Sequence, residues 1–176
     1  IKEIEMSGDM KEILKEHLEL ILGEELARRS LTISVAESCT GGLLGSRITD
    51  VPGSSAYFMG GIIAYSNEVK IKELQVKEDT IAEHGAVSEE TAREMAINIK
   101  RLMNTDLGLA VTGIAGPDGG SQEKPVGLVY VALASNEDVE VYRLNLKGDR
   151  KENKWQTTEY ALYFTYKYIS GKEDFI

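Results

Sequence analysis

The chain has 176 residues, of which 42% are hydrophobic, enough for one domain with a sizeable buried core. Its formal net charge is −9, and the acidic residues are spread along the sequence with no concentrated basic cluster. Because nucleic-acid binding needs a basic surface, and because no apolar run approaches the ~20 residues of a membrane span, this composition excludes nucleic-acid and membrane partners.

The sequence carries a single cysteine, Cys39, which excludes an intrachain disulfide and favours a reducing compartment. With no signal peptide visible, we expect a cytoplasmic protein. Residues 1–8 carry no hydrophobic pattern and are expected to form a linker or a disordered start before a single domain over 9–176. The start at Ile1 leaves open that the chain is the C-terminal part of a longer protein.

Hydrophobic spacing predicts a helix, a strand and a second helix in the first 50 residues. Asp9 can cap a helix that runs to Arg29, with an apolar face formed by Met10, Ile13, Leu14, Leu18, Ile21 and Leu22. Alternating apolar residues then predict a strand over Leu31–Ala36. The helix that follows this strand is expected to end before Pro52-Gly53.

The middle of the chain continues the alternation of strands and helices. Apolar runs predict a buried strand over Gly60–Tyr65 and another strand over Asp106–Val111. Serine caps and glycine boundaries predict three helices between them, over 66–74, 79–83 and 89–103. The last of these should direct Met95, Ile99 and Leu102 inward.

The C-terminal part of the chain predicts a hairpin and a long helix. The runs 126–134 and 139–146 form an antiparallel hairpin, and Asp149 with Glu152 forms a capping box for a helix over 150–170. Strands that alternate with helices, plus one hairpin, predict an α/β fold with helices on both faces of a mixed sheet.

Polar or glycine-rich sequence follows three of the predicted strands, at Ser38–Gly42, Tyr65–Lys70 and Thr112–Gly120. Ligands of such sheets bind at the carboxyl ends of the strands. If the three loops converge, they form one binding site.

The first loop, Ser-Cys-Thr-Gly-Gly, leads from a strand directly into a helix. Free backbone N–H groups at a helix start can bind an anion or an oxyanion, and Ser38 is well placed as a nucleophile beside them. The alternative is that Ser38 and Thr40 only cap the helix. Cys39 is either a competing nucleophile or a small buried side chain. Gly41 and Gly42 would let a substrate approach the backbone.

A nucleophilic serine needs a base, and neither histidine of the chain is a good candidate. Lys70 lies within about one turn of a predicted helix start, where the helix dipole and partial burial would favour its neutral form. Serine–lysine pairs are an established substitute for serine–histidine pairs. The alternative is an ordinary exposed lysine. Tyr65 can relay a proton, orient the lysine, or simply pack in the core.

The third loop, TGIAGPDGG, indicates ligand binding, because so many glycines after a buried strand suggest a close approach to the backbone. Thr112 can donate its hydroxyl to an oxyanion or to the substrate, and Arg150 can pair with a phosphate or lie on the surface. The glycines that we expect to line the site are Gly113, Gly116, Gly119 and Gly120.

Six motifs together resemble the CinA C-terminal domain family, the bacterial nicotinamide-nucleotide amidases. In family order over roughly Leu22–Ile169 they are AESCTGG, DVPGSSAYF, GGIIAYSNEVK, HGAVSEE, TGIAGPDGGSQEKPVG and KGDR. After KGDR, members of this family often carry further arginines where this chain has Lys154-Trp155, which bears on phosphate affinity.

The resemblance implies a three-layer α/β/α sandwich with a mixed, mostly parallel sheet, a homodimer, and no metal or cofactor. It also implies hydrolysis of nicotinamide mononucleotide to nicotinate mononucleotide and ammonia. The family's nucleophile falls on Ser38, its lysine on Lys70, its tyrosine on Tyr65 and its small hydroxyl residue on Thr112. Two other interpretations are a catalytically weak nucleotide-binding or interaction domain in competence or DNA-damage response, and a hydrolase of another amide.

Overall fold

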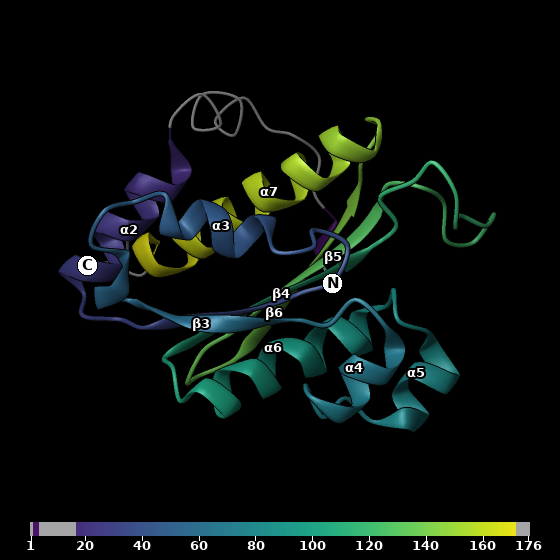
Figure 1. The fold of residues 1–176 in the computed structure, drawn as a ribbon, viewed down its shortest axis with the longest axis horizontal. Helices are drawn as coiled ribbons and strands as arrows, with labels where there is room; N and C mark the ends of the chain where they lie inside the picture. The colour runs from purple at the N-terminus through teal and green to yellow at the C-terminus, as the bar shows by residue number, and fades with distance from the viewer. Residues whose placement is uncertain (1, 4–16, 172–176) are drawn as a thin grey trace.

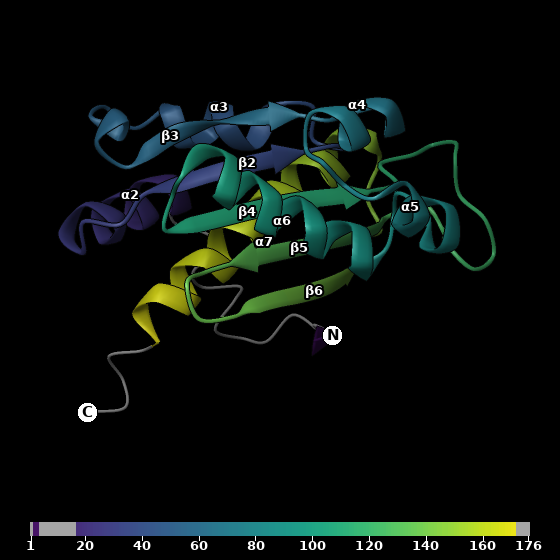
Figure 2. The ribbon, with the colours of Figure 1, turned by 90° about the horizontal axis from the view of Figure 1, so that it is seen from below.

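A six-stranded sheet organises the computed structural model, which describes residues 2–3 and 17–171. Its strands lie in the order β1-β6-β5-β4-β2-β3, with β3 at one edge (Figure 2). Their bounds are β1 Lys2–Glu3, β2 Ile33–Glu37, β3 Phe58–Ile63, β4 Leu107–Gly113, β5 Leu128–Ala134 and β6 Val139–Asn145.

Helices cover both faces of this sheet, with α2, α3 and α7 on one side and α4, α5 and α6 on the other (Figure 1). Their bounds are α2 Leu18–Arg28, α3 Leu43–Thr49, α4 Asn67–Lys72, α5 Glu78–His84, α6 Glu89–Met103 and α7 Arg150–Ser170, with a 3₁₀ turn at Ser54–Ala56. The predicted α/β class is confirmed. Among the described residues, no helix is long and apolar enough to cross a membrane.

The sheet is mixed, because β5 runs opposite to the other five strands, and the short β1 is parallel to β6. Strand β2 pairs in parallel with both β3 and β4, whereas β4–β5 and β5–β6 are antiparallel. The predicted hairpin is therefore confirmed as β5–β6. Because β2, β3 and β4 run the same way, their carboxyl ends meet at one edge of the sheet, where the loops that follow them can form a shared site.

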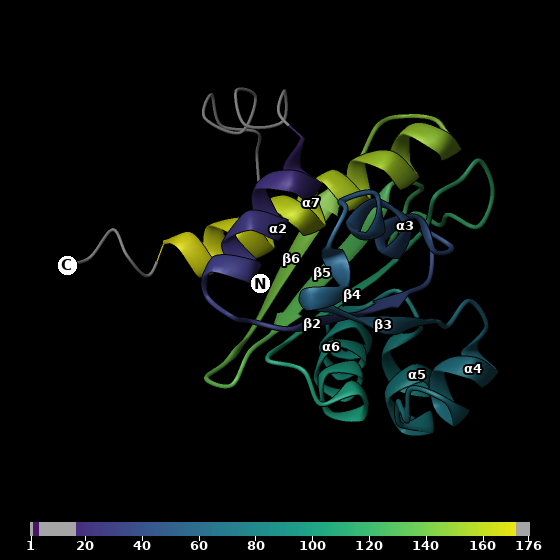
Figure 3. The same ribbon diagram turned by 60° about the vertical axis from the view of Figure 1, so that its left-hand side comes forward.

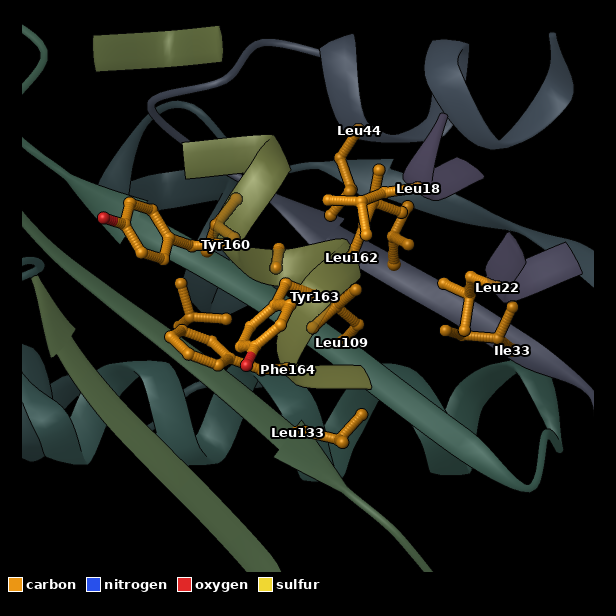
Figure 4. Packing of buried hydrophobic residues seen from close by; sticks show 14 of the residues in the cluster. Leu18, Leu22, Ile33, Leu44, Leu109, Leu133, Tyr160, Leu162, Tyr163 and Phe164 are labelled. Atoms are coloured by element: carbon orange, nitrogen blue, oxygen red, sulfur yellow. The ribbon is translucent and has the colours of Figure 1, made fainter. Parts of the chain in front are cut away.

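Two apolar clusters hold the layers together. On one face, leucines of α2 and aromatic residues of α7 pack on β2, β4 and β5 (Figure 4). On the other face, Met95 and Ile99 of α6 pack over alanines of the central strands. This contact is close, because a Cβ at Gly108 would lie 2.3 Å from the carbonyl oxygen of Ala96.

Most predicted boundaries are confirmed. Helix α6 begins after its Ser88 cap, α4 begins after its Ser66 cap, and α7 carries the predicted capping box of Asp149 and Glu152. The predicted helix start at Asp9 lies outside the described residues.

Three predictions were wrong in detail. The run Gly60–Tyr65 is not a buried strand, because β3 is shifted to 58–63 at the sheet edge, where alternate residues are exposed and Ile63 is 53% exposed. Leu102 is also exposed rather than inward. Within the expected linker 1–8, Lys2–Glu3 pairs with β6. In each case the burial or pairing of the segment depends on the strand or helix that packs against it. The hydrophobic pattern of the segment itself does not specify that neighbour.

A buried arginine links the three helices on one face. The Arg47 guanidinium of α3 lies 2.6 Å from Glu19 of α2 and 2.5 Å from Glu159 of α7, and it donates to Thr158 at 2.9 Å. The same guanidinium lies 4.1 Å from the ring centroid of Trp155. Figure 3 shows α3 beside the N-terminal half of α7.

Arg47→Met should lower the free energy of unfolding by about 3 to 5 kcal/mol, because it leaves two carboxylates without their cation in a buried place. Urea denaturation at neutral pH measures the change. The matched control is Arg28→Met, which removes an ion pair to Glu25 from a side chain that is 53% exposed. That loss should be less than about 1 kcal/mol. Equal losses in the two variants would contradict the linking role of Arg47.

Candidate active site

The three predicted loops meet at one cavity of about 200 Å³ beyond the carboxyl ends of β2, β3 and β4. Seven of the predicted site residues line it: Ser38, Cys39, Tyr65, Lys70, Thr112, Gly113 and Arg150. The remaining lining residues are Asn67, Ala86, Val87 and Ala115. The structure therefore brings these predicted residues together at one cavity, although most of the predicted glycines do not line it.

Ser38 is held at the end of β2 by the backbone. Its N–H donates to the carbonyl of Val111 at 3.0 Å, and its own carbonyl accepts from the N–H of Gly41 at 3.1 Å. Gly41 and Gly42 both have positive φ angles, 60° and 101°, which reverse the chain before α3 begins. A side chain at either position would be strained, so the glycines shape the nucleophile turn.

The start of α3 is already occupied by a side chain of the protein. The Glu37 carboxylate accepts hydrogen bonds from the N–H groups of Gly42, Leu44 and Gly45 at 3.2, 2.8 and 2.9 Å, and from the Thr40 hydroxyl at 2.6 Å. Glu37 is 2% exposed. The expectation that these helix amides face a ligand was therefore wrong, because a buried carboxylate takes the favourable position at the helix N-terminus.

Two amides remain for an oxyanion. The backbone N–H groups of Cys39 and Thr40 have no hydrogen-bond acceptor among the described residues, and they directly follow Ser38. The Cys39 thiol is buried, and burial raises its pKa to about 12. A thiol with this pKa stays protonated at neutral pH, which makes Cys39 a poor nucleophile.

Lys70 lies beside Ser38, with its Nζ 2.9 Å from the serine Oγ. Lys70 comes from α4, whose Ser66 cap accepts a hydrogen bond from Val69, and its side chain turns back toward the end of β3. There its Nζ also donates to the carbonyl oxygens of Ala64 at 2.8 Å and Tyr65 at 3.3 Å.

Burial lowers the pKa of Lys70 from 10.5 to about 8, and the side chain is 1% exposed. No carboxylate forms an ion pair with it among the residues that the structure describes. In the resting geometry Nζ donates to Ser38 Oγ as well as to the two carbonyls, and once it loses a proton, near pH 8, its lone pair becomes available to the serine hydroxyl. The pair can therefore act as a nucleophile and its base.

Tyr65 and Arg150 form the rim of the cavity. Arg150 donates to the Tyr65 hydroxyl at 3.1 Å and to the carbonyl oxygen of Gly116 at 2.7 Å. Tyr65 thus contacts Lys70 through its backbone carbonyl, whereas its hydroxyl points to Arg150. The Tyr65 side chain is 60% exposed, so the predicted packing in the core is wrong, and its hydroxyl forms no hydrogen bond with Lys70 among the described residues.

Thr112 has a different use from the one predicted. Its hydroxyl donates to the carbonyl oxygen of Ala86 at 2.8 Å, and the residue is buried. This bond fastens the segment between α5 and α6 to the cavity wall. The hydroxyl proton is therefore not directed at an oxyanion.

The glycine-rich loop contributes only its first residues to the cavity. A Cβ at Gly116 or Gly120 would come within 2.5 or 2.7 Å of Val126, so these glycines are required by packing inside the loop. Neither Gly119 nor Gly120 lines the cavity beside Ser38, and the Thr40 side chain is turned to Glu37.

Sequence reasoning missed Glu37, Asn67, Ala86 and Val87. An acidic residue at the end of a buried strand, directly before a serine turn, was a usable indication of Glu37. Ala86 and Val87 carry no comparable indication. Among residues 2–3 and 17–171, no group of three or more His, Cys, Asp or Glu could hold a metal ion.

Comparison with known proteins identifies the family to which this chain is similar. The model of the CinA C-terminal domain matches residues 15–169. A competence-damage inducible protein of Halothermothrix orenii is 60% identical over 149 residues, which cover 84% of this chain and 36% of that protein. A relative of the same name from Moorella thermoacetica is 52% identical over 155 residues, covering 88% of this chain and 37% of its own length.

Comparison with solved structures supports the same family. A CinA superfamily protein from Klebsiella pneumoniae superposes with a TM-score of 0.85 at 31% identity, covering 88% of this chain and 98% of that one. A competence/damage inducible protein from Agrobacterium tumefaciens gives 0.82 at 36% identity, with coverages of 92% and 96%. The chain thus matches whole solved domains but spans less than half of the two curated relatives.

The burial of Lys70 predicts a pH-dependent stability. Because its pKa is about 8 in the folded protein and 10.5 when exposed, folding carries a cost below pH 8 that disappears as the pH rises toward 10.5. Between pH 7 and pH 10 the wild type should gain about 2 to 3 kcal/mol relative to Lys70→Met. Denaturant unfolding across this range measures the difference. Parallel curves would show that the amine is charged in the folded state.

Proposed function

Because this chain belongs to the CinA C-terminal domain family and holds a buried lysine against a serine, we propose that it is an amidohydrolase acting on nicotinamide mononucleotide. The products are nicotinate mononucleotide and ammonia. The observation that carries the proposal is the 2.9 Å contact between Lys70 Nζ and Ser38 Oγ inside a cavity. A lysine placed for structural reasons alone would gain nothing from a site that lowers its pKa.

In the first half of the reaction, neutral Lys70 takes the proton of Ser38 as the serine oxygen attacks the carboxamide carbon. The N–H groups of Cys39 and Thr40 stabilise the oxyanion that forms. The Lys70 ammonium then gives its proton to the departing nitrogen, which leaves as ammonia. An ester between Ser38 and the nicotinoyl group remains.

In the second half, Lys70 takes a proton from a water molecule that attacks this ester. The ester bond breaks, the proton returns to Ser38, and the carboxylate product is released. The carbonyls of Ala64 and Tyr65 keep the amine in position throughout, because both accept from its N–H groups in the resting site. One water molecule is consumed, ammonia leaves in the first half and the Ser38 oxygen in the second, and the carboxylic acid that forms releases its proton to the solvent.

The dimensions of the site favour a substrate that extends beyond its carboxamide ring. The cavity of about 200 Å³ is smaller than the roughly 300 Å³ at which typical ligand sites begin. A second cavity of about 610 Å³ shares Ala115 and Arg150 with it. The ring can therefore enter beside Ser38 while the ribose and phosphate extend past the rim that Arg150 forms.

The names of the relatives refer to competence and damage, and a binding domain with an idle site is the rival interpretation. A domain that only binds a ligand would not need the Lys70 amine in contact with the Ser38 hydroxyl. Measurement of ammonia release from nicotinamide mononucleotide separates the two. Nicotinamide and nicotinamide riboside test for a hydrolase of another amide, because an enzyme that recognises phosphate should leave both unreacted.

We also propose a homodimer that pairs two copies of β3. This strand lies at the sheet edge, contains no charged residue or proline, and exposes Met59 and Ile63. Such an uncharged edge offers free backbone groups to a second strand. Antiparallel pairing of two identical edges gives a closed two-fold assembly.

Ser38→Ala and Lys70→Met should each lower the rate of ammonia release by roughly 10³-fold or more, because each removes one half of the reacting pair. The matched controls are Ser46→Ala and Lys72→Met. Ser46 is exposed on α3, and Lys72 is exposed on the same short helix as Lys70. Both controls should keep wild-type activity. A Ser38→Ala protein with full activity would refute the nucleophile.

The pH profile of kcat/KM should rise about tenfold per pH unit and level off near pH 8, since the neutral form of Lys70 is the base. Initial rates of ammonia release between pH 6 and 10 measure it. A rate that is flat across this range would contradict a lysine base.

Met59→Lys should convert a dimer into a monomer, because it places a charge on the exposed face of the β3 edge. Light scattering after size exclusion measures the mass against the 19.4 kDa of one chain. Leu102→Lys, on the exposed face of α6, is the control and should stay dimeric. A wild type that is monomeric at high concentration would refute the dimer.

A further inference from the structure

Lys154 lies beside the turn that holds Ser38. It lies one turn after Arg150 on the same face of α7, and a Cβ at Gly41 would be 3.9 Å from its Nζ. The side chain is half-buried, and it forms no hydrogen bond or ion pair with any residue that the structure describes. A half-buried ammonium in this position is stabilised when an anion binds.

Lys154 also lines a cavity of about 460 Å³ between α3 and α7. The other lining residues are Leu43, Lys151, Glu152, Trp155 and Gln156. Trp155 is 48% exposed and supplies an apolar wall. Glu152 contributes one negative charge, and its carboxylate accepts from the N–H of Asp149 at 2.8 Å in the capping box, against the two positive charges of the lysines. Lys151 and Lys154 therefore leave this cavity positively charged.

Apart from the N–H groups of Cys39 and Thr40, which the proposed mechanism assigns to the oxyanion, two other sets of groups that could bind an anion near Ser38 already have partners. The amides at the start of α3 are taken by Glu37. The guanidinium of Arg150 donates to the Gly116 carbonyl and to the Tyr65 hydroxyl. Among the described residues, the half-buried cation that such an anionic group meets is Lys154, with the exposed Lys151 in the same cavity.

We infer that Lys154 binds the phosphate group of the nucleotide substrate, in the cavity that it shares with Lys151 and Trp155. This inference rests on the proposed amidase function. Ser38 and Lys154 then hold the two ends of one molecule, the carboxamide in the small cavity and the phosphate beyond Gly41. Arg150 lies at the rim between Ser38 and Lys154, where its hydrogen bonds hold Tyr65 and Gly116 in place.

Lys154→Gln should raise KM for nicotinamide mononucleotide about tenfold or more and change kcat less than about twofold, because it removes a charged hydrogen bond to a part of the substrate that does not react. Lys154→Arg should restore most of the affinity. The control is Lys167→Gln, at the far end of α7, which makes the same change of charge. It should leave KM unchanged. An unchanged KM in Lys154→Gln, with normal turnover by the wild type, would overturn the inference and leave the proposed function intact.

Binding can be measured apart from turnover by calorimetry on the folded Ser38→Ala protein. It should bind nicotinamide mononucleotide at least about tenfold more tightly than nicotinamide riboside, and addition of Lys154→Gln should abolish this preference. Inorganic phosphate should compete with the mononucleotide only when Lys154 is present. If the preference survives Lys154→Gln, the phosphate lies elsewhere and the inference fails. If the preference is lost but the wild type releases no ammonia, the subsite stands and the amidase proposal fails.

Discussion

The rest of the site depends on one constraint, the exclusion of water from the Lys70 amine. An ammonium loses much of its hydration when it is buried, and no carboxylate among the described residues compensates it. The result is an amine that gives up its proton near neutral pH while two backbone carbonyls keep it in place. This arrangement costs stability, as reactive sites often do, and the two apolar clusters supply the stability that offsets it.

A second buried charge keeps the serine in position. Glu37 lies next to Ser38 in the sequence, yet its carboxylate points into the protein and binds the first amides of α3. Its negative charge is favourable there because the N-terminus of a helix is positive. Hydrogen bonds to the Glu37 carboxylate therefore hold this turn in place. The positive φ angles of Gly41 and Gly42 give the turn its shape. Ser38 is left lining the cavity, together with Cys39.

Helix α7 contributes to the site although it follows the sheet in sequence. Its capping box sets where the helix begins, so Arg150, Asn153 and Lys154 reach three different parts of the site. Arg150 contacts Tyr65 and Gly116, Asn153 donates to the carbonyl oxygen of Ala115 at 3.0 Å, and Lys154 lies near Gly41. One rigid element thus fastens the β4–β5 loop and lines both neighbouring cavities. The position of α7 relative to the sheet is fixed because its aromatic residues pack on the sheet.

Local sequence determined the helices, their caps and the chemical character of the three loops. Capping at Ser88 and Asp149 depends on side chains within three residues of one another, so it could be read without the fold. Only the tertiary structure decided that Glu37 occupies the start of α3, that the Thr112 hydroxyl turns to Ala86, and that β3 is an edge strand. The same is true of the contact between Ser38 and Lys70. Ser38 and Lys70 are 32 residues apart, and their contact exists because β2 and β3 run in parallel and end together. Hydrogen bonds between distant residues depend on which strands become neighbours, and that choice is made by packing of the whole chain.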